Sequence, residues 1–246
     1  MAAVTEAAKN SEGVTSLHYR VTGTVPDMGR LSAEACMTTK PLAMRMKMTM
    51  ADQPGHPLEV RFVGKTMYVG GKGVDPAKLD GKSWWGVAPA AWGGDALETQ
   101  SYGVLPRQME GSPAVQSTVL AGSPNVRTVG EETVDGTGTT HYTGTVTTKG
   151  LSDARAAADG ATRERLIKTL MYVTGLRIDR TLTMDLWVDG DDRAKQFRVR
   201  GQAFSLQGAN APGPLDLTVT FLDVNQPVTV EAPPTEDTRM GLPSAD

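Results

Sequence analysis

Cysteine is nearly absent from this sequence. Among its 246 residues only Cys36 carries a thiol, so no disulfide can form within the chain. A chain of this length buries about 70% or more of its unfolded surface on folding and needs no such cross-link. Excess positive charge is also missing, since 25 Lys and Arg residues face 28 Asp and Glu residues. Without a basic footprint, nucleic acid is not expected as a partner.

Long apolar runs are missing as well. No apolar stretch approaches the roughly 18 residues that a membrane-spanning helix needs. The first residues, MAAVTE, contain neither the basic nor the apolar region of a signal peptide. We therefore expect either a cytosolic chain or a chain whose targeting segment is not part of this sequence.

The residue patterns of common catalytic and metal sites are not found. The three histidines, His18, His56 and His141, stand apart from one another, whereas a zinc site needs three or four clustered ligands. They are expected to be surface or strand-pairing residues. The sequence also lacks the GxSxG motif that surrounds the catalytic serine of many hydrolases. Cys36 lies in an alternating apolar stretch, where it is expected to pack as a small apolar side chain.

Two glycine-containing segments resemble phosphate- and calcium-binding loops in composition but not in spacing. Residues 70–73, GGKG, lack the phosphate-loop spacing and do not open a helix. Residues 189–192, DGDD, lack the twelve-position calcium loop. Both are interpreted as turns. The sequence thus predicts a protein that is not an enzyme, with no catalytic residue, no metal and no cofactor.

The sequence does contain a strict alternation of apolar and polar residues, the pattern of strands with one dry and one wet face. In residues 42–50, methionines alternate with Arg45, Lys47 and Thr49. Strands are predicted at 15–25, 31–37, 42–50, 60–62 and 67–69 (on either side of a turn at Gly64-Lys65), 84–88, 126–134, 139–148, 182–188, 196–203, 215–221 and 228–230. Helical patterns occur at 2–12, at 95–120 and at 150–174, the last with Ser152 as its expected N-cap.

These patterns together predict a mainly β (α+β) protein. Several strands span nine to eleven residues, and long antiparallel strands twist and coil. We expect one strongly curved antiparallel sheet, an open or half barrel, with helices covering its concave face. The expected boundaries are a helix and linker at 1–13, a single domain at 14–232 and a disordered proline-rich tail at 233–246.

Apolar side chains on the inner face would line a cavity beneath the helices. Flexible, polarizable methionine suits a surface that accommodates varied ligands, although it also fills ordinary cores. Trp84 and Trp85 are open to two interpretations, a rim of the cavity and an ordinary structural corner. The residues predicted to face inward and line the cavity are Leu42, Met44, Met46, Met48, Phe62, Leu182, Met184, Leu186, Phe197, Leu217, Val219 and Phe221.

Five stretches follow one another along the chain: EVRFVGKTMYVGG, GKSWWGV, VGEETVDGTGTTHYTGTV, TLTMDLWVDGDDRAKQFRVRG and LDLTVTFLDVNQPVTVEAPP. In this combination they resemble the LppX/LprG-type lipoproteins of actinobacteria, within the wider LolA/LolB-like superfamily. The resemblance covers about residues 14–234. It implies a curved antiparallel sheet with helices across its mouth, and it makes residues 14–232 a LolA-like lipid-binding domain.

The resemblance also implies a function. Such proteins are exported, non-catalytic lipoproteins that bind a lipid or another acylated ligand in the cavity and carry or present it in the cell envelope. We expect a monomer on the outer face of the plasma membrane. Its lipidated N-terminus would lie outside this sequence, because Cys36 is inside a strand. The alternative is a partner- or peptide-binding signalling or assembly protein of the same fold, with no lipid cargo.

Overall fold

The computed structural model describes residues 2–26, 28–39, 41–64, 66–87, 113–157, 181–204 and 212–241. Six strands come from the N-terminal third of the chain. They are β1 (Ser16–Val25), β2 (Gly29–Thr39), β3 (Leu42–Met50), β4 (Leu58–Val63), β5 (Thr66–Gly70) and β6 (Trp84–Val87), with a short 3-10 helix, η1 (Pro76–Leu79), before β6. Each of these strands pairs antiparallel with the next, so this part of the sheet is a meander.

Five further strands form a second meander. They are β7 (Arg127–Val134), β8 (Thr137–Val146), β9 (Leu182–Asp189), β10 (Ala194–Ala203) and β11 (Gly213–Val224). The turn between β7 and β8 is Asp135-Gly136, with φ values of 46° and 77°, as in the tight hairpins that this residue pair favours. The two meanders join because β11 pairs antiparallel with β1.

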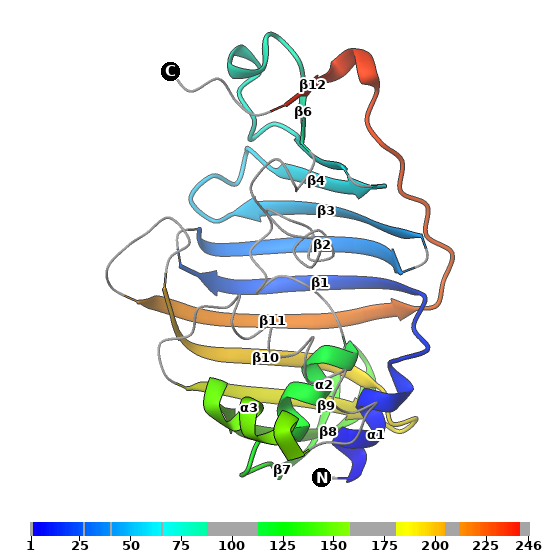
Figure 1. The fold of residues 1–246 in the computed structure, drawn as a ribbon, viewed down its shortest axis with the longest axis vertical. Coiled ribbons are helices and arrows are strands. Elements are labelled where there is room, and N and C mark those ends of the chain that lie inside the picture. The colour runs from blue at the N-terminus through cyan, green and yellow to red at the C-terminus, as the bar shows by residue number, and fades with distance from the viewer. Residues whose placement is uncertain are drawn as a thin grey trace.

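Within the described residues the sheet has twelve strands, in the order β12-β6-β5-β4-β3-β2-β1-β11-β10-β9-β8-β7 (Figure 1). The twelfth strand, β12 (Thr238–Met240), is parallel to β6, and the other neighbours are antiparallel. The prediction of a mainly β protein built on one antiparallel sheet is confirmed. Strands β12 and β7 are the edges, so the described sheet is open.

The end of the chain differs from the prediction. A disordered tail was expected from residue 233, yet the short helix η5 (Thr235–Asp237) and β12 lie there. Side chains of distant residues anchor them: Lys82 donates to the Glu236 carbonyl at 2.6 Å, and Arg239 pairs with Asp80 at 2.8 Å. Composition does not reveal such contacts. The strand predicted at 228–230 is not formed, since residues 226–234 carry no regular structure.

Three α-helices are described: α1 (Ala2–Asn10), α2 (Pro113–Ala121) and α3 (Thr148–Ala157). Helix α1 confirms the first predicted helix. Helix α2 lies within the second, whose residues 95–112 are outside the described part. Helix α3 begins earlier than expected, because the Thr147 hydroxyl, and not Ser152, accepts the hydrogen bond that caps it, from the Gly150 N–H at 3.0 Å. Residues 158–174 of the third predicted helix are outside the described part.

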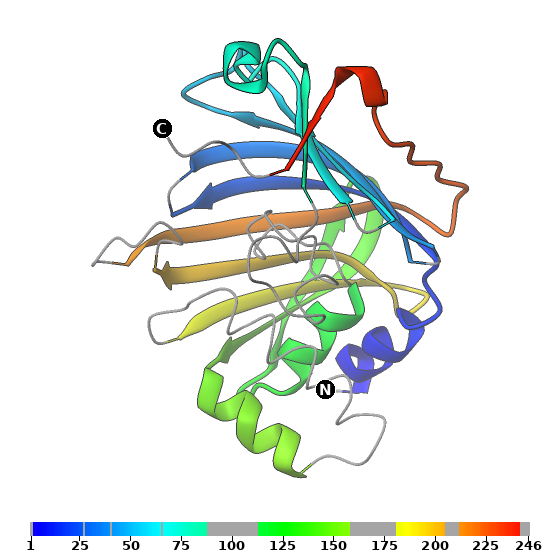
Figure 2. The ribbon, with the colours of Figure 1, turned by 45° about the horizontal axis from the view of Figure 1, so that its top comes forward.

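Helices α1 and α2 lie against one half of the sheet. Helix α2 contacts β8, β9 and β10, and α1 contacts α2 and β9 (Figure 2). The side chain of Asn10, at the end of α1, donates to the carbonyls of Asp191 and Asp192 in the β9–β10 turn, at 3.4 and 3.1 Å. This contact attaches α1 to one end of the sheet. Within the described residues, no helix is long and apolar enough to cross a membrane.

Candidate ligand-binding site

The helix-covered side of the sheet is an apolar surface formed by alternate residues of nearly every long strand. Of the twelve residues predicted to face inward, Leu42 is partly buried and packs against the core, and the other eleven are buried in it. These eleven are Met44, Met46, Met48, Phe62, Leu182, Met184, Leu186, Phe197, Leu217, Val219 and Phe221. Val119 and Leu120 of α2 belong to the same cluster. The prediction that these residues share one face is confirmed, whereas a role in binding stays a prediction.

Methionines form one end of this apolar cluster. Met44, Met46 and Met48 are 0%, 1% and 3% exposed, because the alternation of β3 turns them all to the same side. Their sequence neighbours Arg45 and Lys47 are exposed on the other side. Thioether side chains are flexible and polarizable, so this end of the cluster can adapt its shape to what it contacts.

Aromatic and aliphatic residues form the other end. The rings of Phe197 and Phe221 lie 6.0 Å apart between centroids at an interplanar angle of 41°. This tilted arrangement is favourable for aromatic pairs. Leu186 pairs with Phe197 across β9 and β10. The surface is therefore apolar across the junction of the two meanders.

Helix α2 places polar groups against this apolar surface. Gln116 and Ser117 are both 0% exposed, and neither the Gln116 amide nor the Ser117 hydroxyl has a hydrogen-bond partner among the described residues. Leaving a buried donor or acceptor unpaired costs roughly 1–3 kcal/mol. The neighbouring Thr118, by contrast, donates to the Ala114 carbonyl at 2.8 Å.

The sequence alone does not single out these two polar residues. The signal that could have found them is the uncharged polar triplet Gln-Ser-Thr inside the otherwise apolar helix PAVQSTVLA. The sequence does not show whether this triplet faces water, and only the packing of α2 shows that all three residues are buried.

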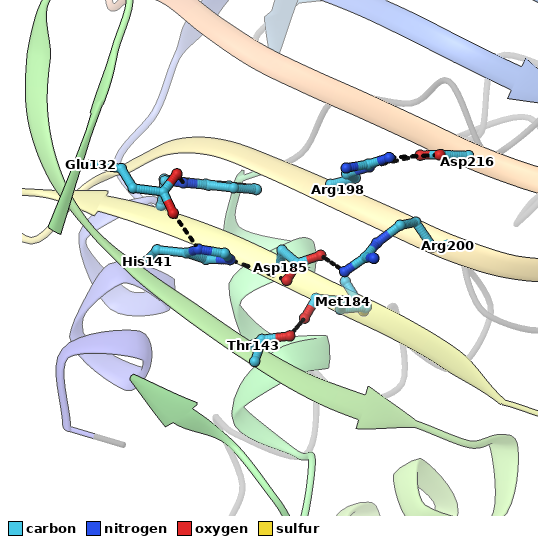
Figure 3. A network of polar contacts seen from close by, with 9 residues as sticks. Glu132, His141, Thr143, Met184, Asp185, Arg198, Arg200 and Asp216 are labelled. Carbon is cyan, nitrogen blue, oxygen red and sulfur yellow. Dashed lines mark hydrogen bonds and ion pairs between the residues drawn. The ribbon is translucent and has the colours of Figure 1, made fainter. Parts of the chain in front are cut away.

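The opposite side of the sheet carries a polar network (Figure 3). Its centre is Asp185, which alternates with the inward-facing Leu182, Met184 and Leu186 of the predicted strand 182–188 and so was expected on the wet face, yet is only 3% exposed. Arg200 donates to one carboxylate oxygen of Asp185 at 2.5 Å, and the Nε2 of His141 lies 3.1 Å from the other. Asp185 is thus on the predicted side of β9, but it is buried against Arg200 and His141, so the expectation of solvent exposure was wrong.

His141 lies between two carboxylates. Its Nδ1 is 2.8 Å from the Glu132 Oε1, and the ring stacks on Trp187 with centroids 4.2 Å apart. Trp187 in turn donates its Nε1 hydrogen to the Glu132 Oε2 at 2.8 Å. His141 lies in a strand, as predicted. The sequence did not indicate that Glu132 and Asp185 are its partners, because neither carboxylate is close to it along the chain. Both contacts are hydrogen bonds only when both ring nitrogens carry hydrogen.

The network shifts the acidity of both carboxyl groups. Hydrogen bonds from Trp187 and His141 lower the pKa of Glu132. Burial by itself would raise the pKa of Asp185, but the hydrogen bonds from Arg200, Thr143 and His141 outweigh burial and lower it. Both groups are therefore anionic near neutral pH. Among the described residues, no cluster of His, Cys, Asp or Glu is suited to a metal ion.

Further ion pairs lie on this side. Arg198 and Asp216 form a two-bond pair with both distances at 2.7 Å, and the Asp216 carboxylate raises the pKa of Arg198. Arg20 of β1 meets Asp135 of the β7–β8 turn at 2.9 Å. Strands β11, β10 and β9 separate β1 from β8 in the sheet order. The tip of the β7–β8 hairpin therefore extends across β9, β10 and β11 to contact β1.

The two tryptophans make contacts at the β6 edge. The guanidinium carbon of Arg61 lies 4.6 Å from the centroid of the Trp84 ring, and the Trp85 Nε1 donates to the Gly241 carbonyl. These contacts favour the interpretation of a structural corner.

No protein-family model matches the sequence. An uncharacterised 31.2 kDa protein from the rplA-rplJ intergenic region of Streptomyces griseus is 30% identical over 136 residues. The aligned region is 55% of this chain and 41% of that protein, so the chain spans less than half of this relative's length.

Two solved structures share the fold over nearly the whole chain. The lipoprotein LppX of Mycobacterium tuberculosis aligns with a TM-score of 0.53 and 20% identity, covering 94% of this chain and 97% of LppX. LprF of Mycobacterium bovis aligns with a TM-score of 0.52 and 17% identity, covering 94% of this chain and 95% of LprF. The chain has the fold of the LppX/LprG-type lipoproteins, as the five sequence stretches predicted.

Proposed function

We propose that this protein is a non-catalytic lipoprotein of the cell envelope that binds a lipid or another acylated ligand against the helix-covered side of its sheet, for transport or presentation. The native chain would be held at the outer face of the plasma membrane by a lipidated segment outside this sequence. The curvature expected of the sheet would form a half barrel around the ligand.

One observation carries the proposal: a single apolar cluster extends across both meanders, on the fold shared with LppX and LprF. Burying acyl chain is worth about 0.8 kcal/mol per methylene. Even a partly enclosed chain of roughly a dozen carbons would therefore retain micromolar affinity after the cost of ordering it. Such a surface recognises chain volume, which suits an acylated ligand.

The test is displacement of a fluorescent fatty-acid probe from the wild type and from Met46→Arg. Met46 is a 1% exposed member of the apolar cluster, so the arginine would obstruct the site and abolish probe binding. Thr49→Arg is the matched control, since Thr49 lies on the same strand and alternates with the buried methionines. It should leave probe binding intact.

Circular dichroism separates the outcomes. A folded Met46→Arg protein that no longer binds the probe supports a ligand site. An unfolded one indicates a solid core, because a charge buried there has no partner. If the wild type binds neither probe nor lipid, the proposal fails, and a partner- or peptide-binding protein of the same fold is the better explanation.

A further inference from the structure

The unpaired polar groups of α2 are exceptional. In native proteins about 90% or more of buried polar groups have a hydrogen-bond partner. Gln116 and Ser117 are both 0% exposed, yet the Gln116 Nε2, the Gln116 Oε1 and the Ser117 Oγ have no such partner in the part of the chain that the structure describes. These three atoms on two adjacent residues can therefore still form hydrogen bonds with a ligand.

The helix directs these groups at the apolar cluster. Residues three and four positions apart share a face of an α-helix. Gln116 therefore lies on the same face as Val119 and Leu120, which are 0% exposed and belong to the cluster. Ser117 shares a face with Leu120 as well. Helix α2 is buried between α1 and strands β8, β9 and β10, and Gln116 lies on the face whose apolar residues join the cluster, with Ser117 beside it.

The charge of α2 restricts what these groups can bind. Its sequence, PAVQSTVLA, contains no acidic or basic residue. A buried carboxylate with no cation from the helix is costly, so a free fatty-acid head group does not suit this position. A neutral carbonyl oxygen needs only a donor, and the amide of Gln116 and the hydroxyl of Ser117 both provide one.

We propose, building on the lipid-binding function above, that Gln116 and Ser117 donate hydrogen bonds to an acyl carbonyl of the bound ligand. The two residues select neutral acyl esters and amides over plain hydrocarbons and free fatty acids. The cluster holds the chain, and α2 recognises the linkage at its end. Sequestered from water, these hydrogen bonds form only when the ligand occupies the site.

The test compares methyl palmitate, octadecane and palmitate as competitors of one fluorescent probe, with wild-type protein and with Gln116→Leu. Leucine keeps similar bulk and removes the amide. The variant is expected to bind methyl palmitate about ten-fold more weakly, the loss typical of one hydrogen bond. Its octadecane affinity should be unchanged. Palmitate should compete less well than methyl palmitate with the wild type.

Thr118→Val is the matched control on the same helix. The Thr118 hydroxyl is buried but already donates to the Ala114 carbonyl, so this variant should keep the wild-type ratio of ester to hydrocarbon affinity. Infrared spectroscopy of isotope-labelled methyl palmitate bound to the wild type gives an independent readout. The carbonyl band should lie at lower frequency than in octadecane solution. Because this measurement uses only the wild type, it remains informative even if Gln116→Leu fails to fold.

The results distinguish this inference from the proposed function. If no competitor displaces the probe from the wild type, the lipid-binding function itself fails. If the wild type binds all three competitors, Gln116→Leu binds methyl palmitate as tightly as the wild type, and the carbonyl band is not shifted, the function stands and the role of Gln116 and Ser117 is refuted.

Discussion

At the scale of single residues, specific hydrogen bonds and ion pairs hold the side chains on the polar side of the sheet in place. Asp185 is almost fully buried, Arg200 forms an ion pair with one of its carboxylate oxygens, and the His141 Nε2 lies 3.1 Å from the other. The charge pattern of β9 predicted correctly which side Asp185 faces. It did not predict the burial, because His141 and Glu132 reach the site from the β7–β8 hairpin, more than forty residues away in the sequence.

Asp185→Asn should lower the free energy of unfolding by about 1–3 kcal/mol, because the amide cannot accept equally from Arg200 and His141. Urea denaturation measures the change. The comparison is Asp216→Asn, whose pair with Arg198 is about 40% exposed on both sides, so its loss should cost about 1 kcal/mol or less. Equal losses in the two variants would show that burial does not strengthen the Asp185 contacts.

The lowered pKa values of Asp185 and Glu132 predict how stability depends on pH. Their ordinary values are 3.8 and 4.5, and the folded state holds both groups below these. The stabilisation is therefore fully present above the ordinary values and is lost as pH falls through the lowered, folded-state pKa values. The free energy of unfolding, measured in urea, should decrease less steeply below about pH 4.5 in an Asp185→Asn/Glu132→Gln double variant. Identical pH profiles would contradict the assignment.

At the scale of elements, alternation of period two was a sufficient signal for most strands. It predicted β3 because buried and exposed residues alternate there with little interruption. It wrongly predicted a strand at residues 228–230, which alternate but form no strand. It missed β12, a short strand that is held by its pairing with β6 and by the contact between Arg239 and Asp80. Short edge strands of this kind depend on their partners, and one sequence segment does not contain that information.

Gly23 joins two strands that are far apart in sequence. It lies in β1 opposite β11, has a φ of 143°, and a Cβ added there would lie 1.9 Å from the Asp216 carbonyl oxygen. Gly23→Ala should therefore destabilise the protein by about 2 kcal/mol or more, since the backbone of β11 would have to shift. Thermal or urea unfolding measures this.

Gly130→Ala provides the control for the Gly23 prediction. Gly130 is also in a strand, but a Cβ there meets nothing within 4 Å, so the substitution should change stability little. A Gly23→Ala protein as stable as Gly130→Ala would mean that β1 and β11 do not approach as closely as described.

At the scale of the whole molecule, the fold class and the composition of the apolar side were predictable from sequence, and the strand order was not. Alternation shows which residues share a side, but the pairing of β1 with β11 joins residues about 200 positions apart. The same limit applies to the candidate site. Its apolar residues follow from period two, whereas Gln116 and Ser117 gain meaning only from the position of α2 against β8, β9 and β10.

The central claim is that the apolar side of the sheet holds an acylated ligand. Its most direct test is to purify the protein from an actinobacterial host, extract it with organic solvent, and identify the extracted lipids by mass spectrometry, with Met46→Arg purified in parallel. We expect an acylated lipid in near-stoichiometric amount with the wild type and none with the folded variant. Wild-type protein that carries no lipid and takes up none from host lipid extracts would contradict it.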